Sequence, residues 1–105
     1  MLEQTRVLLA DDNAAVRDYI ATVLASCCVI VGAVQDGPAV LDAAATLRPD
    51  VIVLDVSMPG MSGFEVATRL REAGSAAAIV FLTLHEDDAF VDAARKAGGL
   101  GYVLK

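Results

Sequence analysis

Short apolar runs recur along this chain and alternate with longer stretches of a different hydrophobic period, and this alternation constrains the fold more than any other feature. Three of the runs are followed at once by a polar side chain, namely Val7–Ala10, Val51–Leu54 and Ile79–Leu82. Continuous apolar runs of this length suit strands that are buried on both faces of a sheet. Cys28–Val31 and Tyr102–Leu104 are further candidates, so we expect five strands.

The stretches between the runs carry apolar residues three and four positions apart, a spacing that places them on one stripe of an α-helix. The four stripes are Val16, Ile20, Val23 and Leu24; Val40, Leu41, Ala44 and Leu47; Phe64, Ala67 and Leu70; and Phe90, Ala93, Ala94 and Ala97. Asn13 is the candidate cap of the first helix. Connections of this length require parallel strands with helices on both faces of the sheet. Since 105 residues fit one domain, the sequence predicts a single α/β domain over residues 1–105, with a doubly wound, five-stranded parallel sheet.

The chain stops at Lys105, directly after the fifth predicted strand, so the C-terminal fifth helix that would close such a fold is absent. Because crossovers are right-handed, the face that carries the first helix would then be short of cover. Hydrophobic residues make up 56% of the chain, as expected for a sheet face that awaits a partner. We expect either a truncated chain or a short domain that forms a homodimer through this uncovered face.

Acidic side chains outnumber basic ones by 14 to 8, which gives a formal net charge of −6. This charge repels phosphate backbones and anionic lipid, so we expect no direct nucleic-acid binding and no membrane association by this segment. The start Met1–Gln4 is not basic, and no apolar run is long enough to span a bilayer. The sequence therefore predicts a cytoplasmic protein.

The two cysteines, Cys27 and Cys28, are adjacent. This spacing is too strained for an ordinary disulfide, and two cysteines are too few for a zinc site. We interpret them as two small core residues, which fits a reducing compartment.

Polar side chains follow the predicted strands where an open parallel sheet binds its ligands, beyond the carboxyl ends. They are Asp11, Asp12, Asp55, Thr83 and Lys105. If the first strand lies beside the third, the carboxylates converge, and each pair repels by about 4 kcal/mol at an effective dielectric constant of roughly 20. A hard divalent cation, Mg²⁺ above all, suits such a set of oxygen ligands, and Lys105 would supply a second positive charge.

A carboxylate in these surroundings is suited to take up a phosphoryl group. Asp55 would attack phosphorus while the cation and Lys105 stabilise the charge on the transferred oxygens, one of which Thr83 could bind. The alternative reading is structural, with Asp11, Asp12 and Asp55 capping the segments that follow them and Lys105 a solvated tail.

Four motifs in a fixed order carry a family resemblance. They are Asp11-Asp12, the stretch Leu54–Gly63, the pair Leu82-Thr83 and the stretch Gly101–Lys105. In these motifs the chain resembles the receiver domain of bacterial two-component response regulators over essentially its whole length. The resemblance implies a flavodoxin-like strand order 2-1-3-4-5 and a sensor histidine kinase as partner.

The resemblance also implies a role for each matching residue. Asp55 corresponds to the phosphoacceptor, and Asp11, Asp12, Asp55 and the backbone carbonyl of Ser57 correspond to the Mg²⁺ site. Thr83 and Lys105 correspond to the pair that contacts the phosphoryl group.

Tyr102 corresponds to the switch aromatic, which is expected to turn inward as Thr83 moves towards the phosphoryl oxygens, although an ordinary half-buried tyrosine is the alternative. Within the family, Leu82–His85 together with Ala97–Lys105 resembles the receivers fused to a LuxR-type helix-turn-helix output. This implies a transcription regulator whose DNA-binding domain is not in this chain. Leu84 is bulkier than is common after the threonine, and His85 is read as a solvent-facing loop residue.

Two other functions remain open. A Mg²⁺-dependent aspartyl-phosphate phosphohydrolase of the haloacid dehalogenase type would need a second acidic residue where Ser57 stands. An interaction module that works without phosphorylation could keep the fold alone. We expect a switch that takes up and slowly hydrolyses its own phosphoryl group, without a separate turnover substrate.

Overall fold

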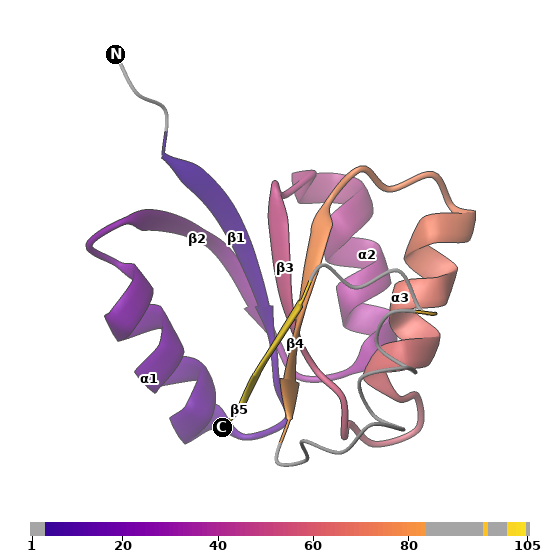
Figure 1. The fold of residues 1–105 in the computed structure, drawn as a ribbon, viewed down its shortest axis with the longest axis horizontal. Coiled ribbons are helices and arrows are strands. Elements are labelled where there is room, and N and C mark those ends of the chain that lie inside the picture. Colours follow the sequence, from indigo (N-terminus) through magenta and orange to yellow (C-terminus); the bar gives the residue numbers. More distant parts are fainter. Residues whose placement is uncertain (1–3, 84–95, 97–100, 105) are drawn as a thin grey trace.

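A computed structural model of the chain describes residues 4–83, residue 96 and the backbone of residues 101–104. Strands and helices alternate over residues 5–83, as predicted (Figure 1). The elements are β1 (Thr5–Ala10), α1 (Ala14–Leu24), β2 (Cys28–Val34), α2 (Gly37–Leu47), β3 (Val51–Asp55), α3 (Gly63–Glu72), β4 (Ala78–Thr83) and β5 (Gly101–Leu104). The helix expected around Phe90 and Ala97 lies outside the described residues.

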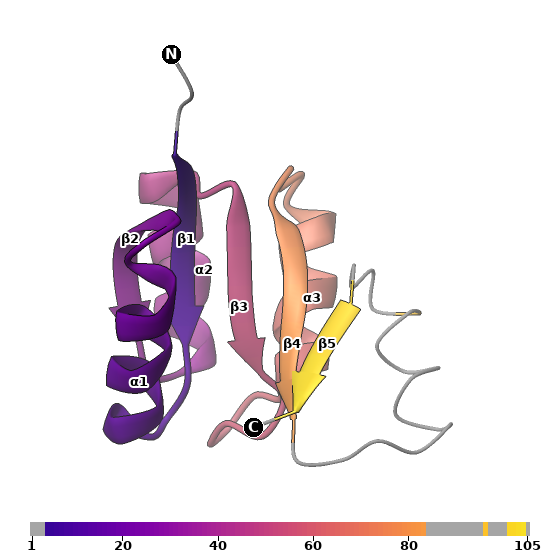
Figure 2. The same cartoon turned by 60° about the vertical axis from the view of Figure 1, so that its left-hand side comes forward.

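The strands form one parallel sheet. Its order is β2-β1-β3-β4, with the backbone of β5 beside β4 (Figure 2). Helix α1 lies on one face of the sheet, and α2 and α3 lie on the other. The predicted α/β class, the parallel sheet and the order 2-1-3-4 are therefore confirmed. The order reverses between β1 and β3, which is where ligands of such sheets bind.

The larger part of the core lies between the sheet and the pair α2 and α3. It contains most of the fully buried large apolar side chains, among them Leu8, Ile52 and Phe81, and Val40 and Val66 from the two helices. On the other face Val7, Leu9, Val53 and Leu82 are buried under α1. Successive residues of β1 alternate between the two clusters, as side chains of a strand must.

Helix α1 covers its face of the sheet incompletely. None of its residues is fully buried, and Tyr19 and Val23 are 71% and 54% exposed. Val23 belongs to the predicted apolar stripe but stays largely exposed, whereas Ile20 of the same stripe packs on the buried cluster. Among the described residues, an apolar groove runs beside α1 over Val53 and Leu82.

The helices α1, α2 and α3 each start at a side-chain cap. The predicted cap Asn13 accepts hydrogen bonds from the amides of Ala15 and Val16, at 2.9 and 3.2 Å. Asp36 and Ser62 cap α2 and α3. None of these helices has the length and apolarity that crossing a bilayer requires, as far as the described part of the chain extends.

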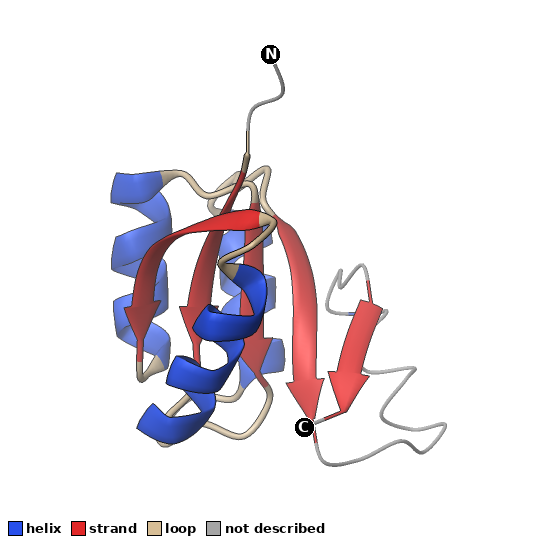
Figure 3. Ribbon diagram, turned by 90° about the vertical axis from the view of Figure 1, so that its left-hand side faces the viewer, coloured by secondary structure: helices blue, strands red, loops and turns tan. Residues whose placement is uncertain are grey.

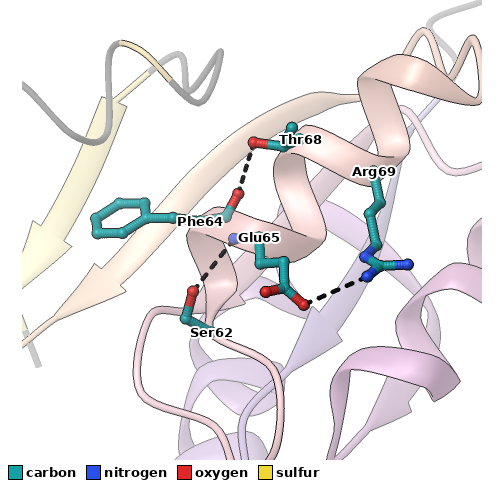
Figure 4. Close-up of polar contacts among 5 residues, drawn as sticks. All are labelled: Ser62, Phe64, Glu65, Thr68 and Arg69. Atoms are coloured by element: carbon teal, nitrogen blue, oxygen red, sulfur yellow. Dashed lines mark hydrogen bonds and ion pairs between the residues drawn. The ribbon is translucent and has the colours of Figure 1, made fainter.

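The first turns of α3 are held by local polar contacts (Figure 4). The hydroxyl of Ser62 accepts from the Glu65 amide at 3.2 Å, and the Thr68 hydroxyl donates to the Phe64 carbonyl at 3.0 Å. Glu65 and Arg69, one turn apart, form an ion pair of 3.7 Å. These contacts fix where α3 begins, and so where the loop from Asp55 must end.

The cysteine pair lies at the start of β2. Cys27 is exposed and Cys28 is half-buried. The interpretation of both as core residues is wrong for Cys27, because the turn that ends α1 places it outside the sheet.

Candidate metal and phosphoryl site

The parallel strands end at the same edge of the sheet (Figure 3). Three of them, β1, β3 and β4, end at or next to polar residues predicted for the site. Asp11 follows β1 and is held there by a hydrogen bond from its amide to the Val34 carbonyl, at 3.1 Å. Asp55 ends β3 opposite Leu82 of β4, and Thr83 ends β4. The parallel arrangement of β1 and β3 thus brings together residues that are far apart in the chain.

The acidic cluster consists of Asp11, Asp12 and Asp55. One carboxylate oxygen from each lies within 4.8 Å of the others. Asp11 and Asp55 are each only 1% exposed, whereas Asp12 faces solvent. The convergence expected from the strand order is therefore present. Because burial strengthens repulsion between like charges, the cluster favours a bound cation.

Backbone amides orient the two buried carboxylates. The Asn13 amide donates to Oδ1 of Asp11 at 2.9 Å, and the Ser57 amide donates to Oδ1 of Asp55 at 3.1 Å. In both cases the donor lies two residues after the acid, a turn that Asp readily forms. The reading of Asp11 as the cap of α1 is wrong, because Asn13 holds that position.

Arg17 is a residue near the site that the sequence did not reveal. Its Nη1 atom donates to the backbone carbonyl of Asp11 at 2.7 Å. This bond ties the first turns of α1 to the loop that carries Asp11 and Asp12. In the sequence, only the position of Arg17 one helical turn after the cap Asn13 could have pointed to this hydrogen bond.

Gly63 is the second residue whose role appears only in the structure. Its amide donates to the Val56 carbonyl at 2.8 Å, which closes the loop between β3 and α3. A Cβ atom here would overlap the carbonyl oxygen of Asp55 and lie 2.9 Å from the Cα of Val56. The loop can return over Asp55 only because position 63 has no side chain.

The acidic cluster fits Mg²⁺ in its chemistry and its dimensions. Mg²⁺ binds hard oxygen ligands, often one or two carboxylates together with waters. Two oxygens on opposite sides of one Mg²⁺ are about 4.2 Å apart, since each bond is 2.0–2.1 Å. Separations within 4.8 Å are therefore of the order that a shared cation requires.

The remaining predicted residues differ in how far the structure describes them. Thr83 is buried, with 3% of its surface exposed, and Ser57 is exposed. The backbone of Tyr102 lies in register with Phe81 of β4. Lys105, Leu84, His85 and the side chain of Tyr102 lie outside the described residues.

Comparisons with known proteins agree with this geometry. Residues 7–105 match the family model of the response regulator receiver domain. The response regulator GacA of Pseudomonas viridiflava is 36% identical over an alignment of 102 residues that covers 95% of this chain and 48% of GacA. The chain spans about half the length of the curated relatives it matches.

Two solved structures are similar over nearly the whole chain. The receiver domain of the response regulator NarL from Mycobacterium tuberculosis has a TM-score of 0.93 at 31% identity, covering 98% of this chain and 85% of that one. A two-component response regulator of the LuxR family from an Aurantimonas species has a TM-score of 0.93 at 30% identity, covering 98% and 75%. With the sheet order, the acidic cluster and the family model in agreement, the chain belongs to the response regulator receiver domain family.

Proposed function

We propose that this receiver domain is a phosphorylation-controlled switch in which a sensor histidine kinase donates its phosphoryl group to Asp55. The observation that carries the proposal is the position of Asp55. Its carboxylate is buried at the end of β3, beside Asp11 and Asp12. A nucleophilic carboxylate among like charges needs a cation before it can accept an anionic group.

The chemistry follows from the placement of Asp55. A carboxylate oxygen attacks phosphorus, an oxygen–phosphorus bond forms, and the phosphorus–nitrogen bond of the phosphohistidine breaks, which returns the electron pair to the imidazole. The Ser57 amide fixes the rotation of the carboxylate through Oδ1. Mg²⁺ held by Asp11, Asp12, Asp55 and the Ser57 carbonyl would neutralise charge on the transferred oxygens.

The switch would involve Thr83, Lys105 and Tyr102. We infer that the Thr83 hydroxyl and the Lys105 ammonium bind phosphoryl oxygens, and that Tyr102 moves inward when Thr83 moves. Turning a minor state from 1% to 99% of the population needs about 5.5 kcal/mol. Hydrogen bonds to a charged group contribute about 1.5–3 kcal/mol each, so a few such contacts suffice.

The output would lie in a longer protein. Since the relatives are about twice as long as this chain, we infer a LuxR-type DNA-binding domain beyond the receiver, in a cytoplasmic regulator. The receiver itself would not contact DNA, because its net charge is −6. We further infer a homodimer through the open face beside α1, and slow hydrolysis of the phosphoryl group by the domain itself.

The test is phosphorylation by acetyl phosphate in the presence of Mg²⁺, with the modified residue located by mass spectrometry. One phosphoryl group should appear on Asp55, and none should appear after chelation of Mg²⁺ or in Asp55→Asn. Asp50→Asn is the matched control, because Asp50 is an exposed aspartate just before β3. Phosphorylation that persists in Asp55→Asn would place the acceptor elsewhere. A domain that never becomes labelled would favour the interaction module.

A further inference from the structure

Two sulfur atoms lie close together at the turn between α1 and β2. The Sγ atoms of Cys27 and Cys28 are 3.5 Å apart. Neighbouring side chains within a strand point to opposite faces of the sheet, but only Cys28 belongs to β2, and Cys27 is still in the preceding turn. The turn therefore directs both sulfurs to the same place.

The backbone around the pair is well anchored. The Cys27 amide donates to the Leu24 carbonyl at 3.0 Å, and its sulfur lies 3.6 Å from the same oxygen. Cys28 is paired with Thr5 of β1, and its side chain packs on the apolar cluster beneath α1. One thiol is thus open to solvent and the other is held at the edge of the core.

The contacts of the two thiols allow one consistent arrangement of donors and acceptors. The Cys27 thiol can donate to the Leu24 carbonyl, which leaves its sulfur as the acceptor for the Cys28 thiol. This hydrogen bond, followed by desolvation and the charge of Cys27, raises the pKa of Cys28. The thiol form of Cys28 is therefore favoured over its thiolate.

We propose that Cys27 and Cys28 form a dithiol site that chelates organic compounds of trivalent arsenic. Thiolates prefer soft partners, and a pyramidal arsenic(III) centre accepts two sulfurs at a separation close to that of the pair. Structural zinc needs four ligands, of which the pair supplies two. A disulfide would need the sulfurs to approach to about 2.05 Å, against the pairing that holds Cys28 in β2.

The proposed reaction exchanges oxygen for sulfur on arsenic without a change of oxidation state. With phenylarsine oxide, the Cys27 and Cys28 sulfurs each form one bond to arsenic. The arsenic–oxygen bonding is lost, and the two thiol protons leave with the oxygen as one water molecule. No oxidant or further reactant is needed.

The fold contributes by holding the sulfurs in place before binding. Rigid preorganisation strengthens binding because less motion is lost when the ligand arrives. The turn lies at the edge of the sheet where β2 begins, away from the carboxyl ends that carry the acidic cluster (Figure 1). The dithiol site should therefore work without any effect on phosphorylation of Asp55.

The test uses phenylarsine oxide with the whole chain, and intact-mass measurement before and after addition of ethanedithiol as a competitor. The native chain should gain one phenylarsenic group and lose two thiol hydrogens. Cys27→Ser and Cys28→Ser should each lose the adduct at ethanedithiol concentrations at least tenfold lower. Cys27→Ser is the safer variant, because Cys27 is exposed, and circular dichroism would check the fold of both.

Two results would overturn the proposal. One is an adduct that resists ethanedithiol equally in Cys28→Ser, since a single sulfur would then suffice. The other is equal resistance in the native chain and in urea, where two adjacent cysteines remain but the fold does not hold them. Acetyl phosphate labelling in parallel separates this proposal from that for Asp55, because either can fail while the other stands.

Discussion

Gly63 lies directly against the backbone carbonyl of Asp55, so closely that a Cβ atom at position 63 would overlap the carbonyl oxygen. The neighbour in conflict is backbone at the end of a buried strand, which cannot rotate away as a side chain could. The start of α3 therefore sets the position of the candidate phosphoacceptor. This relationship links a helix boundary to the chemistry of the site.

Gly63→Ala should destabilise the domain and impair phosphorylation of Asp55 together. Forcing a methyl group into a packed position typically costs about 1–3 kcal/mol, and the loop would have to move off Asp55. Urea unfolding and the rate of labelling by acetyl phosphate measure the two effects. Gly74→Ala is the control, because Gly74 has φ of 83° and a Cβ atom there would meet open space. It should lower stability by backbone strain and leave labelling unchanged, and unimpaired labelling of Gly63→Ala would contradict the assignment.

Asp12→Asn should stabilise the domain when Mg²⁺ is absent and remove the stabilisation that Mg²⁺ confers. Removing one of three clustered carboxylates relieves repulsion, by about 0.5–1 kcal/mol, because water screens the exposed Asp12. A cation that binds only the folded state raises the melting temperature by mass action. Thermal unfolding with and without Mg²⁺ gives both quantities.

Asp18→Asn serves as the control for Asp12, since Asp18 is an exposed acid on α1 outside the cluster. It should keep the full response to Mg²⁺. If the wild-type chain shows no Mg²⁺-dependent rise in melting temperature, the cluster is not a Mg²⁺ site.

Much of the fold could be predicted because local patterns determine it. The apolar runs identified the strands, and Asn13 identified the start of α1. The spacing of apolar residues along a helix, however, does not predict how much of that apolar stripe the sheet will bury. Val23 belongs to the periodic stripe of α1 but remains 54% exposed, since the residues of α1 that pack on the buried cluster of the sheet are Ile20, Ala21 and Leu24.

The site was predictable to the extent that it depends on strand ends. Asp11, Asp12 and Asp55 follow apolar runs, and parallel strands bring such ends together. The contact of Gly63 with Asp55 and the bond from Arg17 to Asp11 depend on how a helix is placed over a loop. The spacing of residue types along the sequence does not predict where a helix lies over a loop.

Arg17→Ala should loosen the loop that carries Asp11 and Asp12. The lost hydrogen bond from Nη1 to the Asp11 carbonyl is expected to lower stability by about 0.5–1.5 kcal/mol and to weaken the response to Mg²⁺. Denaturant unfolding and Mg²⁺ titration check the two effects. Arg69→Ala removes an exposed arginine whose ion pair with Glu65 is worth only about 0.3–0.5 kcal/mol. A similar loss of Mg²⁺ response in both variants would show that Arg17 has no special part in the site.

Alkylation of Cys28 by iodoacetamide should move to lower pH in Cys27→Ala. The hydrogen bond to Cys27, followed by desolvation and the charge of Cys27, raises the pKa of Cys28, and the thiolate is the nucleophile. A raised pKa means that the Cys28 thiolate forms only at higher pH. Cys27→Ala removes the largest cause of the shift, so the Cys28 thiolate should form at lower pH than in the native chain.

Ser26→Ala is the control, since it alters the same turn and keeps both cysteines, and it should leave the pH profile of Cys28 unchanged. Peptide mapping after short alkylation at graded pH measures the profiles. An unchanged profile of Cys28 in Cys27→Ala would show that the Sγ–Sγ contact at 3.5 Å does not raise its pKa.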